Sequence, residues 1–480
     1  MVSKMVDAQA TIAREVTRPR GIWYMGAKAR VIPGFLDTVL REEVPAGGTI
    51  VDLMSGSGVV SAHCARRYRV FAADVQRYAA VIAASFIECD PRGKEERLAG
   101  VDPLGDLDDA YRTNLAALEA LYSPALAVEA EFLAAFLRRE HDDDWARRYR
   151  EFLENSWAVH GGARSGPGQS LYAAALPLLE EESVAAYRNE PGRLPACLVT
   201  AYYANVYFGL RQALQIDSLR IAIERFAAID TDRAWRGTLY LSALLHAASV
   251  STSGTSHFAQ PRHLTKDSEL RAMAKRRTQD ARAEFDSACE HLVDVARSIP
   301  HREGNRAFAG EFASFVSPRE EGGGLRFPDR VDCVYLDPPY TADHYSRFYH
   351  VLEVLTRFDY PELKRDRHGA VLRGRYPAHG YRFQSGFCRR HAVEGEFARV
   401  IAAAAASGAK LVISYASPSG LLLEEYARRH PGEDPVARFE SLCRRSYRRV
   451  ETRRKDLLHS GQGDSAKRIE ELLVICARPR

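Results

Sequence analysis

The stretch VDCVYLDPPY (residues 331–340) combines an apolar run with an acid, two prolines and an aromatic ring. The run predicts a buried strand, and Asp337 then stands at the strand end. The two prolines remove two backbone donors and fix φ twice, so the turn is stiff and presents its carbonyl groups. The Asp337 carboxylate and the Pro338 carbonyl form an acceptor pair for both N–H groups of an exocyclic amine, and Tyr340 offers a face for a flipped base. The stretch indicates a site that methylates an exocyclic amine, although X-Pro-Pro also ends strands that have no such role.

A second stretch, TIVDLMSGSGVVS (residues 49–61), predicts a buried strand, a glycine turn and the start of a helix. Glycines allow the backbone to approach a ligand closely, and a helix N-terminus offers free N–H donors. The next apolar run, residues 70–74, ends in an acid, where a doubly wound sheet binds ribose hydroxyls. The GSG turn lacks the third glycine of the dinucleotide fingerprint, which argues against NAD. The prediction is a nucleoside cofactor, with candidate contacts Asp52, Gly56, Gly58 and Asp74.

With the opening WYMGAK (residues 23–28), these pieces resemble the Dam-type (D12 class) adenine-specific DNA methyltransferases, and their order along the chain is also similar. Ala27 is a departure, because the family usually has glycine there. The resemblance implies S-adenosylmethionine as cofactor, bound by Tyr24, Lys28, Asp74 and Asp337. It implies catalysis by Asp337, Pro338 and Tyr340 on adenine N6 in DNA.

More than 250 residues separate Asp74 from Asp337, although both must face one pocket. A Rossmann-like sheet needs far fewer, so most of this stretch is predicted to be an insert. Residues 108–136, 186–227 and 269–299 have helical character, and 249–265 is a polar loop. We therefore expect three parts: residues 1–107 as the N-terminal half of the methyltransferase domain, 108–304 as a helical insert, and 305–480 as the C-terminal half. The resemblance implies that the insert recognises the target, whereas a purely structural helical domain is the alternative.

Two further apolar runs, residues 410–415 and 471–476, predict additional strands of the sheet. The segment after the DPPY turn predicts a helix that carries aromatic side chains. Tyr345 and Phe348 are candidates for the wall of the base pocket, and core packing is the alternative for both.

Composition is consistent with a globular enzyme of two or three domains: 480 residues, 46% hydrophobic and 27% charged. The net charge of +4 is too small to identify a nucleic-acid partner. Basic segments at 271–277, 364–375 and 444–455 suit phosphate contacts, or equally solvated helix faces. The eight cysteines form no CxxC pair, so neither a disulfide framework nor a metal site is expected. No apolar run approaches about 20 residues, and we expect a cytoplasmic protein without membrane contact.

The sequence thus predicts a Rossmann-like α/β methyltransferase fold with a large, mainly helical insert. The expected reaction is methyl transfer from S-adenosylmethionine to adenine N6 in double-stranded DNA, by base flipping. Cytosine N4 is the first alternative, since the DPPY chemistry requires only an exocyclic amine. The second is a DNA-binding defence-system subunit with a vestigial site. Restriction or phage-defence proteins are the expected partners.

Overall fold

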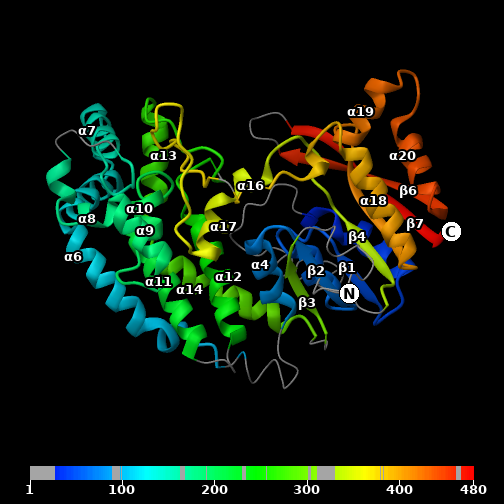
Figure 1. Ribbon diagram of the computed structural model, residues 1–480, viewed down its shortest axis with the longest axis horizontal. Coiled ribbons are helices and arrows are strands. Elements are labelled where there is room, and N and C mark those ends of the chain that lie inside the picture. The colour runs from blue at the N-terminus through cyan, green and yellow to red at the C-terminus, as the bar shows by residue number, and fades with distance from the viewer. Residues whose placement is uncertain are drawn as a thin grey trace, which may run out of the picture.

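A computed structural model describes residues 28–88, 98, 100–162, 168–190, 192–229, 234–255, 257–300, 304–310, 330–378, 380–381, 383–460 and 466–480. The chain forms a mixed α/β structure around one seven-stranded sheet (Figure 1). The strand order is β3-β2-β1-β4-β5-β7-β6. The strands are β1 (Thr49–Asp52), β2 (Arg69–Asp74), β3 (Arg306–Ala309), β4 (Cys333–Leu336), β5 (Lys410–Ser417), β6 (Tyr447–Ser460) and β7 (Ala466–Pro479).

The first five strands of this order are parallel, and β7 is antiparallel to both of its neighbours. In β1, Asp52 pairs with Ala72 of β2 on one side and with Tyr335 of β4 on the other. This register aligns the carboxyl ends of β1, β2 and β4. Loops that follow parallel strands at such an edge are the usual ligand site of open α/β sheets.

Side chains of the sheet alternate between two separate cores. Ile50, Cys333 and Tyr335 face one core, while their neighbours Val51 and Val334 face the other. This alternation follows from the period of two along a strand. The strands are apolar on both faces because helices cover both, as parallel strands require.

On the face of Val51 the cover consists of α18 (Val393–Ala406), α19 (Leu421–Arg429) and α20 (Pro435–Arg444). The opposite face packs against α2 (Asp37–Glu43), α3 (Val59–Cys64) and α4 (Arg77–Ile87). Short helical turns η1 (Lys28–Arg30), η2 (Ile32–Leu36) and η5 (Gly386–Cys388) accompany them.

The remaining helices gather on the other side of the molecule, at the left of Figure 1. The hydroxyls of Ser85 on α4 and Ser242 on α12 lie 3.0 Å apart, and one continuous core joins the two halves. These elements are α6 (Pro103–Leu137), α7 (Asp143–Glu154), η3 (Gln169–Tyr172), α8 (Leu176–Leu179), α9 (Glu181–Asn189), α10 (Leu198–Tyr203), α11 (Leu210–Ile229), α12 (Ala234–Ser251), α13 (Asp267–Arg277) and α14 (Ala281–Arg297).

Helix α6 is long and apolar enough, by length and composition, to cross a membrane. About a fifth of its apolar window, 22%, is buried in the structure. The buried Asn114 side chain donates to the Ser218 hydroxyl at 3.1 Å, and the buried Glu129 carboxylate accepts from the N–H groups of Leu210 and Arg211. These contacts hold α6 along α11.

The predicted strands at 49–52, 70–74, 331–336, 410–415 and 471–476 are confirmed, but two strands were missed. The short β3 is half exposed, and its sequence RAFA carries no clear apolar alternation. The basic segment 444–455, which also suited a helix face, lies mostly in β6 at the sheet edge. The helical character expected at 269–299 is confirmed, but it belongs to two helices, α13 and α14, and not to one. Asp280 accepts the N–H of Ala283 and starts α14 as a separate helix.

The chain between α17 and η5 packs against the helical half. After α16 (Tyr345–Phe348) and α17 (His350–Arg357), residues 363–377 form a short antiparallel hairpin, here called the basic hairpin. The Tyr376 hydroxyl donates to the Ala259 carbonyl, and the Arg375 guanidinium donates to the His160 carbonyl at 2.8 Å. A segment from the expected C-terminal half thus contacts the expected insert. The boundaries at 107 and 304 remain predictions.

Candidate active site

The carboxyl ends of three neighbouring parallel strands carry acids around one pocket. Asp52 ends β1, Asp74 ends β2 and Asp337 follows β4 directly. All three line a single open pocket of about 1080 Å³, part of which is open to solvent. The glycine turn, at residues 55–57, and the DPPY turn, at residues 337–340, form much of its wall. The two stretches selected from the sequence are therefore parts of one site.

The DPPY turn is held by a buried polar cluster. The Lys28 ammonium lies 2.9 Å from Asp337 Oδ1 and 3.4 Å from Glu471 Oε1. The Tyr340 hydroxyl lies 3.0 Å from Asp337 Oδ1 and 2.7 Å from Glu471 Oε1, and it also contacts the Lys28 ammonium. Ser414 on β5 donates its hydroxyl to the same Glu471 oxygen. Elements far apart in the sequence thus fix the orientation of Asp337.

The glycine turn is shaped by Asp74. Its carboxylate accepts the N–H of Gly56 at 3.0 Å and the N–H of Gln76 at 2.9 Å. Gly58 has a φ of +70°, and an added Cβ there would lie 3.1 Å from the ring of Phe86. Glycine is therefore required at position 58 both by the backbone conformation and by the space available.

Asp52 is completely buried, and only one of its carboxylate oxygens is engaged. Oδ2 accepts the Ser61 hydroxyl at 2.6 Å, while Oδ1 is buried and has no hydrogen-bond partner among the described residues. Unpaired buried acceptors are rare in native proteins, because each costs about 1–3 kcal/mol. An orphaned acceptor in a pocket wall indicates a donor supplied by a ligand or by water.

The pocket has an excess of acidic groups. Burial raises the pKa of Asp52 to about 7, and the same cause raises the pKa values of Asp74 and Asp337 to about 6. Burial also lowers the pKa of Lys28, but Asp337 and Glu471 outweigh this effect and the net shift is upward. Three carboxyl groups and one ammonium thus line the pocket, and Glu471 adds a fourth carboxyl group behind Lys28. A ligand that brings a positive charge and hydrogen-bond donors would offset the cost of ionising these acids.

The outer wall of the pocket contains a second group of residues. Its members come from the segments on either side of α17 and of the basic hairpin: His344, Tyr345, Ser346, Phe383, Gln384, Ser385 and Cys388. Tyr345 lines the pocket as expected. Phe348 instead packs edge-on against His257, with ring centroids 4.6 Å apart, and it is not part of the lining.

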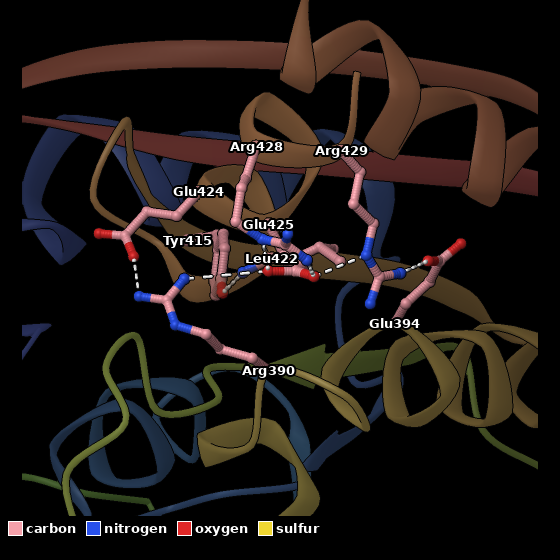
Figure 2. Close-up of polar contacts among 8 residues, drawn as sticks. All are labelled: Arg390, Glu394, Tyr415, Leu422, Glu424, Glu425, Arg428 and Arg429. Atoms are coloured by element: carbon pink, nitrogen blue, oxygen red, sulfur yellow. Dashed lines mark hydrogen bonds and ion pairs between the residues drawn. The ribbon is translucent and has the colours of Figure 1, made fainter. Parts of the chain in front are cut away.

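An arginine and glutamate network braces this wall from outside (Figure 2). Arg390, which follows η5, contacts Glu424 at 2.8 Å, and Arg429 contacts the buried Glu425 at 2.6 Å. The hydrogen bond from Arg428 is the main cause that lowers the pKa of Glu425 to about 2. This network ties the end of the wall segment to α19.

Helix α19 also touches the DPPY turn. The N–H of Leu421, its first residue, donates to the Tyr340 carbonyl at 2.8 Å, and the next N–H donates to the Tyr415 hydroxyl. The rings of Tyr340 and Tyr415 meet edge to face at 5.3 Å. Tyr340 is thereby held at its backbone, ring and hydroxyl.

The structure brings together Lys28, Asp52, Gly56, Asp74, Asp337, Pro338 and Tyr340, and Gly58 completes the same glycine turn. Tyr24 lies outside the described residues. Sequence reasoning missed Glu471, Ser414 and the wall residues Phe383 and Gln384. The only signal for Glu471 was an acid at the start of an apolar run, and the wall residues have no motif.

The polar loop expected at 249–265 is buried in its first part. Ser251, Thr252 and Ser253 are at most 4% exposed, and the Ser253 hydroxyl donates to the Tyr207 carbonyl. These side chains form hydrogen bonds inside the protein, because the basic hairpin packs over this loop. Among the residues of this segment that the structure describes, the exposed positions lie at 260, 263 and 265.

The three basic segments differ in their partners. Arginines of β6 pair with acids: Arg453 lies 2.6 Å from Glu42, and Arg454 lies 3.2 Å from Glu470. Arg277 is buried and donates to Asn205 at 3.0 Å. In the basic hairpin, exposed cations have no carboxylate partner among the described residues, namely Lys364, Arg367 and Arg373. The hairpin therefore offers three exposed positive charges for phosphate contacts.

Within the described residues, no group of three or more His, Cys, Asp or Glu side chains is arranged to hold a metal ion. The seven described cysteines are free and buried.

Two curated methyltransferases match part of the chain. The modification methylase LlaI of Lactococcus lactis subsp. lactis is 30% identical over 159 residues, which make up 33% of this chain and 21% of that protein. The type II methyltransferase M.FokI of Planomicrobium okeanokoites is 25% identical over 225 residues, or 46% of this chain and 28% of that protein. No protein-family model matches. The chain thus spans about a fifth to just over a quarter of these relatives, and its similarity to DNA modification methylases is distant and partial.

Proposed function

We propose that this protein is an S-adenosylmethionine-dependent DNA methyltransferase that modifies adenine N6. The observation that carries the proposal is the single pocket in which Asp52, Asp74 and the DPPY turn meet at the ends of adjacent parallel strands. The partial similarity to DNA modification methylases supports the same reaction class. The strand order, with one antiparallel strand inserted near an edge, is consistent with a methyltransferase fold.

The residues of the pocket fit the cofactor. Each oxygen of Asp74 accepts one backbone N–H, which leaves a second lone pair on each for ribose hydroxyls. The orphaned Oδ1 of Asp52 accepts a further donor, such as the ammonium group of the methionine part. The excess of carboxylates suits a cationic sulfonium. When bound, the cofactor supplies an electrophilic methyl group.

The chain's own residues then act on the target amine. The amino group of adenine is a weak nucleophile, because its lone pair is delocalised into the ring. Asp337 and the Pro338 carbonyl accept its two N–H groups and return electron density to the nitrogen. Tyr340 and Tyr345 offer aromatic faces for the extruded base. Lys28 keeps Asp337 ionised and oriented.

Adenine is preferred over cytosine on the resemblance of the WYMGAK opening and on the order of the motifs. The neutral amide of Gln384 in the outer wall adds support, because its N–H group can donate to N7 of adenine, an acceptor that cytosine lacks. Cytosine N4 methylation is the alternative. Two relatives from modification systems make a restriction endonuclease the expected functional partner.

The decisive experiment is to express the chain, digest cellular DNA to nucleosides and identify the modified base by mass spectrometry. We expect N6-methyladenine in DNA from cells with the wild-type chain and none with the Asp337→Ala variant. N4-methylcytosine would overturn the base assignment and leave the mechanism. No modified base in DNA, with label from the cofactor in RNA or protein instead, would overturn the substrate class.

A further inference from the structure

Glu471 is a buried acid beside the catalytic turn that neither motif contains. It lies on β7 opposite Ala416, near the carboxyl end of β5, and its side chain is 4% exposed. Its Oε1 atom alone meets Lys28, Tyr340 and Ser414. Burying a carboxylate costs several kcal/mol unless its partners repay that cost. Packing alone would be served at lower cost by an apolar residue in this strand, whose neighbours Leu472 and Leu473 are apolar.

The charges of the cluster suggest what Glu471 contributes. Lys28 is shared between two carboxylates, at 2.9 Å from Asp337 and 3.4 Å from Glu471. If Asp337 alone faced the ammonium, the pair would be neutral, and Asp337 would be a weak acceptor toward the target amine. With Glu471 present, the cluster carries one net negative charge. The second carboxylate offsets part of the pull of the Lys28 ammonium on Asp337, so the oxygens of Asp337 accept hydrogen bonds more strongly than in the isolated pair.

Resting on the function proposed above, we propose that Glu471 is a positioning residue that shares Lys28 with Asp337 and so keeps Asp337 a strong, electron-rich hydrogen-bond acceptor for the target amine. Glu471 is not part of the pocket lining, so it acts through Lys28 and Tyr340. Lys28 orients the Asp337 carboxylate. Glu471 offsets part of the Lys28 charge, so that the Asp337 oxygens stay strong acceptors.

The groups that face Asp337 define the expected pH behaviour. They are Lys28 on η1, Glu471 on β7, Tyr340 and Tyr335 around β4, Tyr345 on α16, and Asp52 at the end of β1. Lys28 lowers the pKa of Asp337, whereas Glu471 raises it. Removal of the Glu471 charge must therefore lower this pKa and move the acid limb of the rate profile to lower pH.

The test compares Glu471→Gln with Glu470→Gln. The first removes the charge from the buried cluster but keeps the shape and an acceptor oxygen, and the second removes the neighbouring charge on β7, which lies 3.2 Å from Arg454. For Glu471→Gln we expect kcat to fall by about 10- to 100-fold, less than the roughly 10²–10³-fold lost with a group that contacts the reacting atoms directly. Cofactor and DNA affinity should stay within about threefold of wild type, and the acid limb should shift downward. Glu470→Gln should retain most of kcat and the wild-type pH profile.

Two outcomes would overturn the inference. One is a Glu471→Gln variant with wild-type kcat and an unchanged acid limb. The other is an equal loss in both variants, with lowered melting temperatures and no pH shift, which would mark Glu471 as a packing residue. Failure of the wild type to methylate DNA would instead refute the proposed function. Carbon-13 NMR titration of Asp337 measures the effect of the Glu471 charge on Asp337 without turnover. An Asp337 pKa that is equal in the wild type and in Glu471→Gln would also overturn the inference.

Discussion

Replacement of Asp337 by alanine is the most direct perturbation of the site. It removes the only carboxylate of the DPPY turn, which lies 2.9 Å from Lys28 and 3.0 Å from the Tyr340 hydroxyl. Loss of one preorganised electrostatic contributor costs about 2.7–4 kcal/mol in the transition state, or roughly 10²–10³-fold in kcat. We therefore expect methyl transfer to fall by at least 10²-fold, measured with labelled cofactor and duplex DNA.

The fold should survive this change for a reason visible in the cluster. A buried ammonium stripped of its partner costs about 3–5 kcal/mol. In the alanine variant Lys28 still has Glu471 at 3.4 Å and the Tyr340 hydroxyl, so most of that penalty is avoided. Duplex DNA binding should persist because phosphate contacts elsewhere supply affinity. Asp343→Ala is the matched control. This exposed acid lies beside the turn, and its carboxylate accepts a hydrogen bond from the Thr341 hydroxyl. Activity within tenfold of wild type in Asp337→Ala would refute the assignment of Asp337.

Three further predictions concern the cofactor, the DNA and pH. Asp74→Ala should weaken S-adenosylmethionine binding by about 1–3 kcal/mol, because the acceptor of Gly56, Gln76 and the ribose hydroxyls is lost; an unchanged Kd in calorimetry would move the ribose acid elsewhere. Neutralising the basic hairpin (Lys364, Arg367 and Arg373 to Gln) should weaken DNA binding and flatten its salt dependence by about 2–3 units of slope, from three lost phosphate contacts. Replacing the acid-paired arginines of β6 (Arg453 and Arg454) by Gln should change neither the affinity nor the salt dependence, and equal effects would contradict the distinction between unpaired and acid-paired cations. Since burial raises the pKa of Asp52 to about 7, the folded chain holds a proton there that the unfolded chain has lost above about pH 4. This group's contribution to the free energy of unfolding therefore falls as pH rises from about 4 to 7. Urea unfolding of the ligand-free Asp52→Asn variant should show a smaller loss of stability over this range than wild type, and identical slopes would show that Asp52 ionises freely.

The parallel core of the sheet and its ligand edge could be predicted from the sequence for a local reason. Strands β1, β2 and β4 are short apolar runs, and an acid ends each run or follows it directly. The length of each strand and the position of its end can therefore be recognised from a few neighbouring residues. The motif order then joined Lys28, Asp74 and Asp337 across hundreds of positions. Strand β6 escaped this reasoning because its outward positions are arginines paired with acids on other elements. A strand whose outward side chains are paired arginines is as charged as an exposed helix face. Its sequence lacks the apolar alternation that predicts a strand.

Glu471 escaped for a different reason. Its meaning depends on Lys28 and Tyr340, which are 443 and 131 positions away, and on the antiparallel insertion of β7 beside β5. A buried charge is favourable only when ion-pair and hydrogen-bond partners surround it. The partners of Glu471 are too far away in the sequence to be recognised in one short segment. The wall residues Phe383 and Gln384 have the same difficulty, since they are defined by the pocket that they face.

The placement of the basic hairpin bears on how target recognition reaches the chemistry. The chain leaves the pocket wall at Ser346, forms α17 and the hairpin, and returns to the wall at Phe383. Between these points it is fastened to the helical half by Tyr376 and Arg375. Under the proposed function, these two contacts link the helical half to the segment that carries both parts of the outer wall. We therefore expect target recognition to involve the basic hairpin as well as residues 108–304.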